Sequence, residues 1–111
     1  MTSNYIENIR HLTTWLRDER DLNSARLAML LRQNGINTKT ALCVKIFPDT
    51  KFPESGIVIT AQKEIFQFTF NPSFIRSPQQ GFDEWHNLTE RYLQHQWRDE
   101  ILAGLEILKI S

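Results

Sequence analysis

The sequence predicts a single α+β domain over residues 1–111, with a three-stranded antiparallel meander flanked by helices in the order ααβββαα. The main indication is the segment 56–70, where two β-rich runs are separated by a short polar break. In the second run Phe66, Phe68 and Phe70 alternate with other residues, as in a strand with one buried face. Apolar residues at helical spacing on both sides of this segment predict the helices that cover that face.

Two helices are expected before the sheet. Residues 5–18 carry apolar side chains at helical spacing, which indicates the first helix. A second helix is expected over residues 22–34, with Asp21 or Asn23 as its N-terminal cap. Gly35 then supplies the left-handed residue that ends a helix in a Schellman motif, so the boundary of this helix is well defined.

The first strand is expected over residues 40–47. Strict alternation would place three apolar side chains on one face, Leu42, Val44 and Ile46. The segment 48–55 contains two prolines, which lack the amide that a sheet needs, and is therefore expected to be a loop at the edge or the end of the sheet. The hairpin of residues 56–70 completes the meander.

The last part of the chain is expected to be helical. A helix would begin at Ser77 or at Asp83, where a cap residue precedes a periodic segment. One stripe of that helix would be formed by Trp85, Leu88 and Tyr92. A second stripe is shifted in phase and consists of Trp97, Ile101, Leu105 and Leu108. The change of phase predicts a break or bend near residues 94–96.

Charge and cysteine content narrow the classes of function and location. Lys and Arg together number 13, as do Asp and Glu, so the net charge is zero and no nucleic-acid partner is expected. The single cysteine excludes an intramolecular disulfide, and no apolar run is long enough to span a membrane. These features predict a cytoplasmic protein that does not bind a membrane.

The motifs of common enzymes and metal sites are missing from the sequence. Cys43 lies between apolar residues of a predicted strand, where cysteine behaves as a small hydrophobe rather than as a nucleophile. His86 and Glu90 are four residues apart on a predicted helix, but no HExxH or CxxC motif accompanies them. Four scattered glycines cannot form a phosphate-binding loop. No enzymatic activity, metal or cofactor is therefore expected.

One part of the chain resembles a known class of proteins. The hairpin G-I-V-I-T-x(4)-I-F-x-F-x-F, followed by D-E-W-x-x-L-T, is similar to segments of small bacterial immunity proteins of polymorphic or contact-dependent toxin systems. The matching residues are 56–60, 65–70 and 83–89, about a third of the chain. The resemblance implies a protein that neutralises a cognate toxin by direct binding. Many immunity proteins that block nuclease toxins are acidic, whereas this chain is neutral.

We therefore expect a non-enzymatic binding protein, with a bacterial toxin domain as the expected partner. Exposed aromatic and charged residues are candidates for the contact with the partner: Asp49, Lys51, Phe52, Glu54, Asp83, Glu84, His86 and Glu90. Two alternatives remain. The chain could be an adaptor that forms a homo-oligomer through the stripe that begins at Trp97. It could also bind a small molecule in a pocket between sheet and helices, lined by Trp85, Tyr92 and His95.

Overall fold

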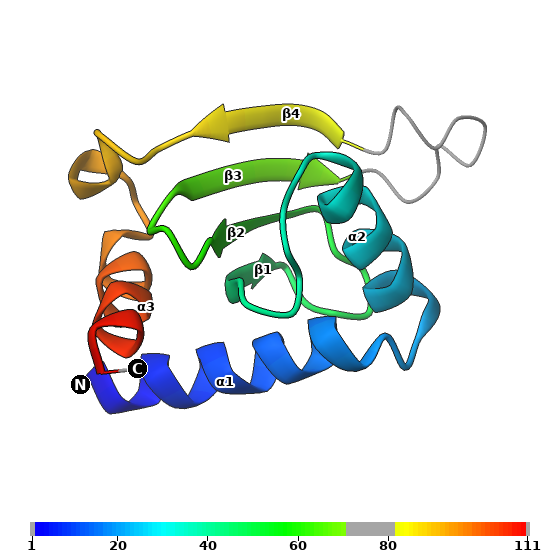
Figure 1. The fold of residues 1–111 in the computed structure, drawn as a ribbon, viewed down its shortest axis with the longest axis horizontal. Helices are drawn as coiled ribbons and strands as arrows, with labels where there is room; N and C mark the ends of the chain where they lie inside the picture. Colours follow the sequence, from blue (N-terminus) through cyan, green and yellow to red (C-terminus); the bar gives the residue numbers. More distant parts are fainter. Residues whose placement is uncertain (1, 71–81, 111) are drawn as a thin grey trace.

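The computed structural model describes residues 2–70 and 82–110 (Figure 1). The elements follow the chain in the order α1 (Thr2–Asp18), α2 (Leu22–Gln33), β1 (Leu42–Phe47), β2 (Ser55–Ile59), β3 (Ile65–Phe70), β4 (Phe82–Asn87), the 3₁₀-helix η2 (Tyr92–Gln94) and α3 (Arg98–Ile110). The four strands form one antiparallel sheet in the order β1-β2-β3-β4. The predicted α+β class and the antiparallel meander are confirmed, but the sheet has a fourth strand.

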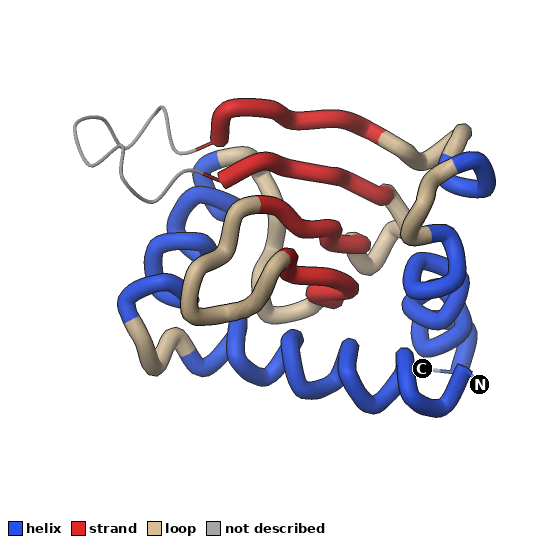
Figure 2. Tube along the Cα trace, turned by 180° about the vertical axis from the view of Figure 1, so that it is seen from behind, coloured by secondary structure: helices blue, strands red, loops and turns tan. Residues whose placement is uncertain are grey.

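The helices surround the sheet on three sides. In Figure 1 and in the opposite view of Figure 2, α1 runs along the β1 edge, whereas α2 and α3 stand at opposite ends of the sheet. The hydroxyl of Thr13 in α1 accepts a hydrogen bond from the buried amide of Cys43 in β1, at 3.0 Å. Helix α1 thus covers one edge of the sheet, and β4 forms the other edge.

Buried side chains form two clusters on opposite faces of the sheet. We call the cluster that contains α2 the α2-side core; its sheet residues are Cys43, Ile46, Val58 and Phe68, with Phe66, Phe82 and Trp85 packed against it. The α3-side core contains Leu42, Val44, Ile57, Ile59, Ile65, Leu88, Ile101 and Ala103. Helix α1 contributes to both, because Leu12 and Leu16 belong to the α2-side core and Ile9 to the α3-side core.

The first two helices form as predicted. Asp21 caps α2 in a reciprocal capping box, in which its carboxylate accepts from the Ser24 amide and Ser24 Oγ accepts from the Asp21 amide. Gly35 has φ +82°, and the amides of Gly35 and Ile36 donate to the carbonyls of Arg32 and Leu31. These two bonds are the complete Schellman pattern, so the predicted end of the helix is confirmed.

The hairpin of β2 and β3 is confirmed, but the expected distribution of side chains is wrong in two places. A strand with one buried face would leave Ile65, on the side opposite Phe66 and Phe68, at the surface, yet it is 1% exposed and belongs to the α3-side core. In β1 a bulge between Cys43 and Lys45 interrupts the alternation. Val44 and Ile46 consequently lie in different cores, although strict alternation places them on one face. Helices bury both faces of the sheet, whereas the sequence pattern predicted only one buried face.

The predicted helix around Trp85 is wrong, because residues 82–87 form strand β4. Trp85 is paired with Phe68 in the ladder and stacks on Phe66, with ring centroids 5.0 Å apart. The aromatic face of β3 therefore continues onto β4, and pairing also satisfies the backbone of β3. Asp83, one of the two expected helix starts, lies inside β4; the other, Ser77, lies outside the described residues.

The break near residues 94–96 is confirmed. The 3₁₀-helix η2 ends at Gln94, and α3 begins only at Arg98. The stripe of α3 that includes Ile101, Leu105 and Leu108 packs on the α3-side core. In the part of the chain that the structure describes, no helix combines the length and the apolar character needed to cross a membrane.

Candidate functional site

Four of the eight predicted contact residues lie together in the loop between β1 and β2. We call residues 48–54 the Phe52 loop. Asp49, Lys51, Phe52 and Glu54 are all exposed there. The loop also contains Pro53, whose ring is buried and anchors the second half of the loop on the protein. These four predicted contact residues thus lie in one exposed loop.

Hydrogen bonds within the loop and to α2 fix the conformation of the Phe52 loop. One carboxylate oxygen of Asp49 accepts from the amides of Lys51 and Phe52, at 2.8 and 2.9 Å. The side-chain amide of Asn23 donates to the carbonyls of Thr50 and Lys51, at 3.2 and 2.9 Å. Asp49 therefore has an internal structural role, and the side chains left for a partner are those of Lys51, Phe52 and Glu54.

The Phe52 ring is the largest apolar group that the loop offers to solvent. Its exposed fraction is 72%, and that of Leu22, at the start of α2, is 74%. Asn23 is the neighbour of Leu22 and bonds the backbone of the loop, so the start of α2 lies against the segment that carries Phe52. Leu22 and Asn23 were not among the predicted contact residues, because a leucine at a helix start is usually counted with the core.

The other predicted contact residues lie elsewhere. Glu84 and His86 project from β4 and are exposed, with 3.5 Å between Glu84 Oε2 and His86 Nε2. Glu90 follows β4 in a turn at the far end of the sheet, so it does not form the predicted helical pair with His86. Asp83 is the extra residue of a β4 bulge opposite β3, and its side chain lies outside the described part of the structure.

A polar and aromatic cluster over the α3-side face of the sheet was not predicted. Lys45 of β1 forms an ion pair with Glu100 in the first turn of α3, at 3.5 Å. The Lys45 ammonium also lies 5.7 Å from the centre of the Trp97 ring. Phe47 and His95 flank that ring, with centroid distances of 5.9 and 5.5 Å. These contacts join β1 to the segment that leads into α3.

His95 is held in one neutral tautomer. Its Nε2 lies 3.1 Å from the side-chain oxygen of Gln67, so Nε2 carries the hydrogen, and its Nδ1 accepts from the amide of Trp97. Burial lowers the pKa of His95, and the nearby Glu100 carboxylate opposes this effect only in part. The imidazole thus serves as a fixed bridge between β3 and the start of α3.

Cys43 is enclosed in the α2-side core. Burial raises the pKa of its thiol to about 12, so the thiol is not a nucleophile near neutral pH. Within residues 2–70 and 82–110, no group of three or more His, Cys, Asp or Glu side chains is arranged to hold a metal ion.

The residues of the alternative small-molecule pocket do not share one space. Trp85 packs against the α2-side core, whereas Tyr92 packs against the α3-side core on the other face. His95 lies over Gln67 of β3. The stripe proposed for self-association also has contacts inside the chain, because Ile101 is fully buried and Leu105 packs against it.

Comparisons with protein-family models, with curated proteins and with solved structures found no match to this chain.

Proposed function

We propose that this chain is a non-enzymatic binding protein that contacts a protein partner through the Phe52 loop and Leu22. The observation that carries the proposal is the 72% exposure of Phe52 on a loop held by Asp49 and Asn23. An exposed phenylalanine that becomes fully buried contributes about 1.5–3 kcal/mol. Because the loop is already ordered by its own hydrogen bonds, little conformational entropy is lost when a partner covers it.

The polar neighbours of Phe52 suit the rim of such an interface. Lys51 and Glu54 carry opposite charges before and after Phe52 in the loop, and both are exposed. Protein interfaces commonly place an aromatic anchor at the centre and charged groups around it, where they direct the partner's orientation. We expect Phe52 and Leu22 to supply most of the affinity and the two charges to supply specificity.

The partner that we propose is a toxin domain of a bacterial competition system. This part of the proposal is supported by the resemblance of the β2–β3 hairpin and residues 83–89 to immunity proteins. Residues 83–87 are a strand rather than the start of a helix, so the structural part of the resemblance is limited to the β2–β3 hairpin. An immunity protein needs no reactive group of its own, because covering the active site of the toxin suffices.

The test compares capture by the wild type with capture by surface variants. The tagged chain and the variants Leu22→Ala and Phe52→Ala are incubated with lysate of the native host, and bound proteins are quantified by mass spectrometry. Leu93→Ala is the matched control, since Leu93 is 55% exposed on η2, away from the loop. We expect one stoichiometric partner that the wild type and Leu93→Ala retain and that Phe52→Ala loses.

A second step tests the nature of the partner. The C-terminal domain of the captured protein is expressed in a heterologous bacterium with or without this chain. Growth arrest that the wild type relieves and Phe52→Ala does not would support the immunity function. Equal relief by Phe52→Ala would contradict the role of the loop, and a captured protein that does not inhibit growth would contradict the toxin partner.

A further inference from the structure

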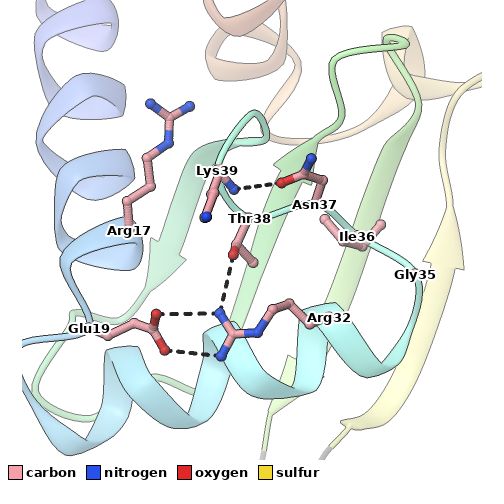
Figure 3. A pocket seen from close by; sticks show the side chains of 8 residues that line it. All are labelled: Arg17, Glu19, Arg32, Gly35, Ile36, Asn37, Thr38 and Lys39. Atoms are coloured by element: carbon pink, nitrogen blue, oxygen red, sulfur yellow. Dashed lines mark hydrogen bonds and ion pairs between the residues drawn. The ribbon is translucent and has the colours of Figure 1, made fainter.

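A cavity lies between the end of α1 and the connection from α2 to β1, well separated from the Phe52 loop at the other end of α2. Its volume is about 490 Å³, within the range of small-molecule sites. Arg17 of α1, Arg32 of α2 and Lys39 of the connection all line it (Figure 3). Three separate segments thus bring three cationic side chains to one hollow, in a chain with zero net charge.

One of the three cations is already paired within the wall. The Arg32 guanidinium binds both carboxylate oxygens of Glu19, at 3.1 and 3.4 Å, and also donates to the hydroxyl of Thr38 at 3.3 Å. Figure 3 shows this network along one side of the cavity. A guanidinium held by three acceptors is fixed in position, and the Thr38 hydroxyl keeps its own hydrogen as a donor.

The other two cations leave the cavity with a positive excess. Arg17 donates to the carbonyl of Ala41 at 3.1 Å, which orients its guanidinium but does not neutralise its charge. Glu19 is the one carboxylate among the residues that line the cavity, against Arg17, Arg32 and Lys39. The described lining therefore carries a net charge of about +2 at neutral pH, and burial of an anion there is favourable.

The rest of the lining is mixed, because Asn37 and Thr38 are polar and Ile36 supplies the one apolar side chain among the lining residues. Ile36 is 6% exposed and lies beside Gly35, where an added Cβ would meet no atom within 4 Å. A flat or compact apolar group can therefore rest against Ile36 and the glycine while a charged end reaches the cations. Such a combination of an apolar wall and a few placed charges is typical of small-molecule sites.

We propose that this cavity binds a small molecule that carries a phosphate or carboxylate group on a compact apolar body. The anionic end pairs with Arg17 and Lys39 and accepts a hydrogen bond from Thr38, and the apolar part covers Ile36. Arg32 and Glu19 form the fixed base of the site. This inference is independent of the protein partner, because none of the cavity residues belongs to the Phe52 loop.

The experiment is an NMR titration of the ¹⁵N-labelled full chain with four probes: phenyl phosphate, benzoate, inorganic phosphate and benzyl alcohol. The anionic aromatic probes test the complete proposal, inorganic phosphate tests the charge alone, and benzyl alcohol tests the apolar wall alone. We expect saturable shifts of the amide signals of residues 35–39 with phenyl phosphate or benzoate. Inorganic phosphate should bind more weakly at the same amides, and benzyl alcohol should leave them unchanged.

Charge variants locate the site. Lys39→Gln removes a cation whose ammonium group makes no hydrogen bond or ion pair with the described residues, and we expect it to weaken phenyl phosphate binding at least about fivefold. Arg17→Gln should have a similar effect, with thermal unfolding measured to correct for the lost bond to Ala41. The control is Arg10→Gln, which removes an exposed cation from the same helix outside the cavity.

Two results would overturn the proposal. One is the absence of saturable shifts at residues 35–39 with both anionic aromatic probes. The other is binding that Lys39→Gln and Arg17→Gln weaken no more than Arg10→Gln does, since this would reflect net charge and not a site. A preference for phenyl phosphate over benzoate, or the reverse, would identify which anionic group the natural ligand carries.

Discussion

The two faces of the sheet are built from the same strands, but they differ in chemistry. On the α2 side, Phe66, Phe68, Phe82 and Trp85 form a continuous group of aromatic rings, with neighbouring centroids 5.0–6.5 Å apart. On the α3 side, aliphatic residues form the core, and a polar cluster around Lys45 and His95 lies beside it. The core of the α2-side face is mainly aromatic, and the α3-side face combines aliphatic packing with a cluster of polar contacts.

The difference in chemistry between the two faces corresponds to the way each helix is held on the sheet. Helix α2 is held by its caps, by the bonds from Asn23 to the Phe52 loop and by the Arg32–Glu19 pair. Helix α3 follows the segment 88–97, which contains the 3₁₀-helix η2. The Lys45–Glu100 and Gln67–His95 contacts fix its position, because polar pairs have narrow geometric requirements.

The largest expected effect is the loss of the aromatic packing. Phe68 is 1% exposed, and its ring lies against Phe82 and Trp85. We expect Phe68→Ala to lower the free energy of unfolding by about 3–5 kcal/mol. Ile65→Ala, in the same strand but on the other face, should cost about 2–5 kcal/mol. Urea denaturation of both variants measures the contrast, and a smaller loss for Phe68→Ala than for Ile65→Ala would contradict the importance of the aromatic face.

A second prediction concerns the close approach of the strands on the α2 side. A Cβ on Gly56 would lie 2.5 Å from the carbonyl oxygen of Lys45 and 2.7 Å from Cζ of Phe68. Since the carbonyl belongs to the backbone and cannot move freely, Gly56→Ala should destabilise the protein by about 1–3 kcal/mol. Ser55→Ala is the control in the same strand. Thermal unfolding that is unchanged in Gly56→Ala would show that the β1–β2 pairing is looser than described.

Local signals explain why the first half of the fold could be predicted. The caps at Asp21 and Gly35 and the hairpin turn at residues 60–64 depend on residues close in sequence. Strand β4 could not be recognised in this way. Trp85, Leu88 and Tyr92 fit a helical spacing, but the partner of Trp85 is the aromatic face of β3, across the connection between the two strands. Tertiary pairing here overrides the local pattern.

The candidate contact surface likewise combines residues that the local sequence predicted with residues that only the tertiary structure brings together. Asp49, Lys51, Phe52 and Glu54 are consecutive or nearly so, and prolines on both sides marked them as a loop. The contribution of Leu22 depends on hydrogen bonds between Asn23 and residues 50 and 51, which lie 27 and 28 positions away. The cavity lined by Arg17, Arg32 and Lys39 likewise depends on residues from three separate segments of the chain, α1, α2 and the connection to β1. A lysine within the apolar strand β1 was the one sequence signal for the cluster around Trp97.

A third prediction separates the polar contacts of the α3 side from ordinary surface pairs. Lys45 and Glu100 have side-chain exposures of 28% and 13%. Lys45→Met leaves the half-buried Glu100 carboxylate without its cation and should cost about 1–2 kcal/mol. The control is Arg20→Met at the exposed Asp18–Arg20 pair, where we expect a change below about 0.5 kcal/mol. Equal effects of the two substitutions would mean that the Lys45 pair does not hold α3.

The smallest predicted effect is a dependence of stability on pH that comes from His95. Burial lowers the pKa of His95 in the folded chain below its ordinary value, so the unfolded chain binds the proton more tightly. The free energy of unfolding is therefore not reduced by His95 above about pH 6.5 and declines as the pH falls toward the folded pKa, because the unfolded chain takes up the proton first. The nearby Glu100 carboxylate opposes the lowering of this pKa by burial and so moderates the effect. His95→Gln, compared with the wild type by urea denaturation between pH 5 and 8, should flatten this part of the profile. An equal decline below pH 6.5 in both proteins would assign the dependence to other groups and would leave His95 as a packing residue.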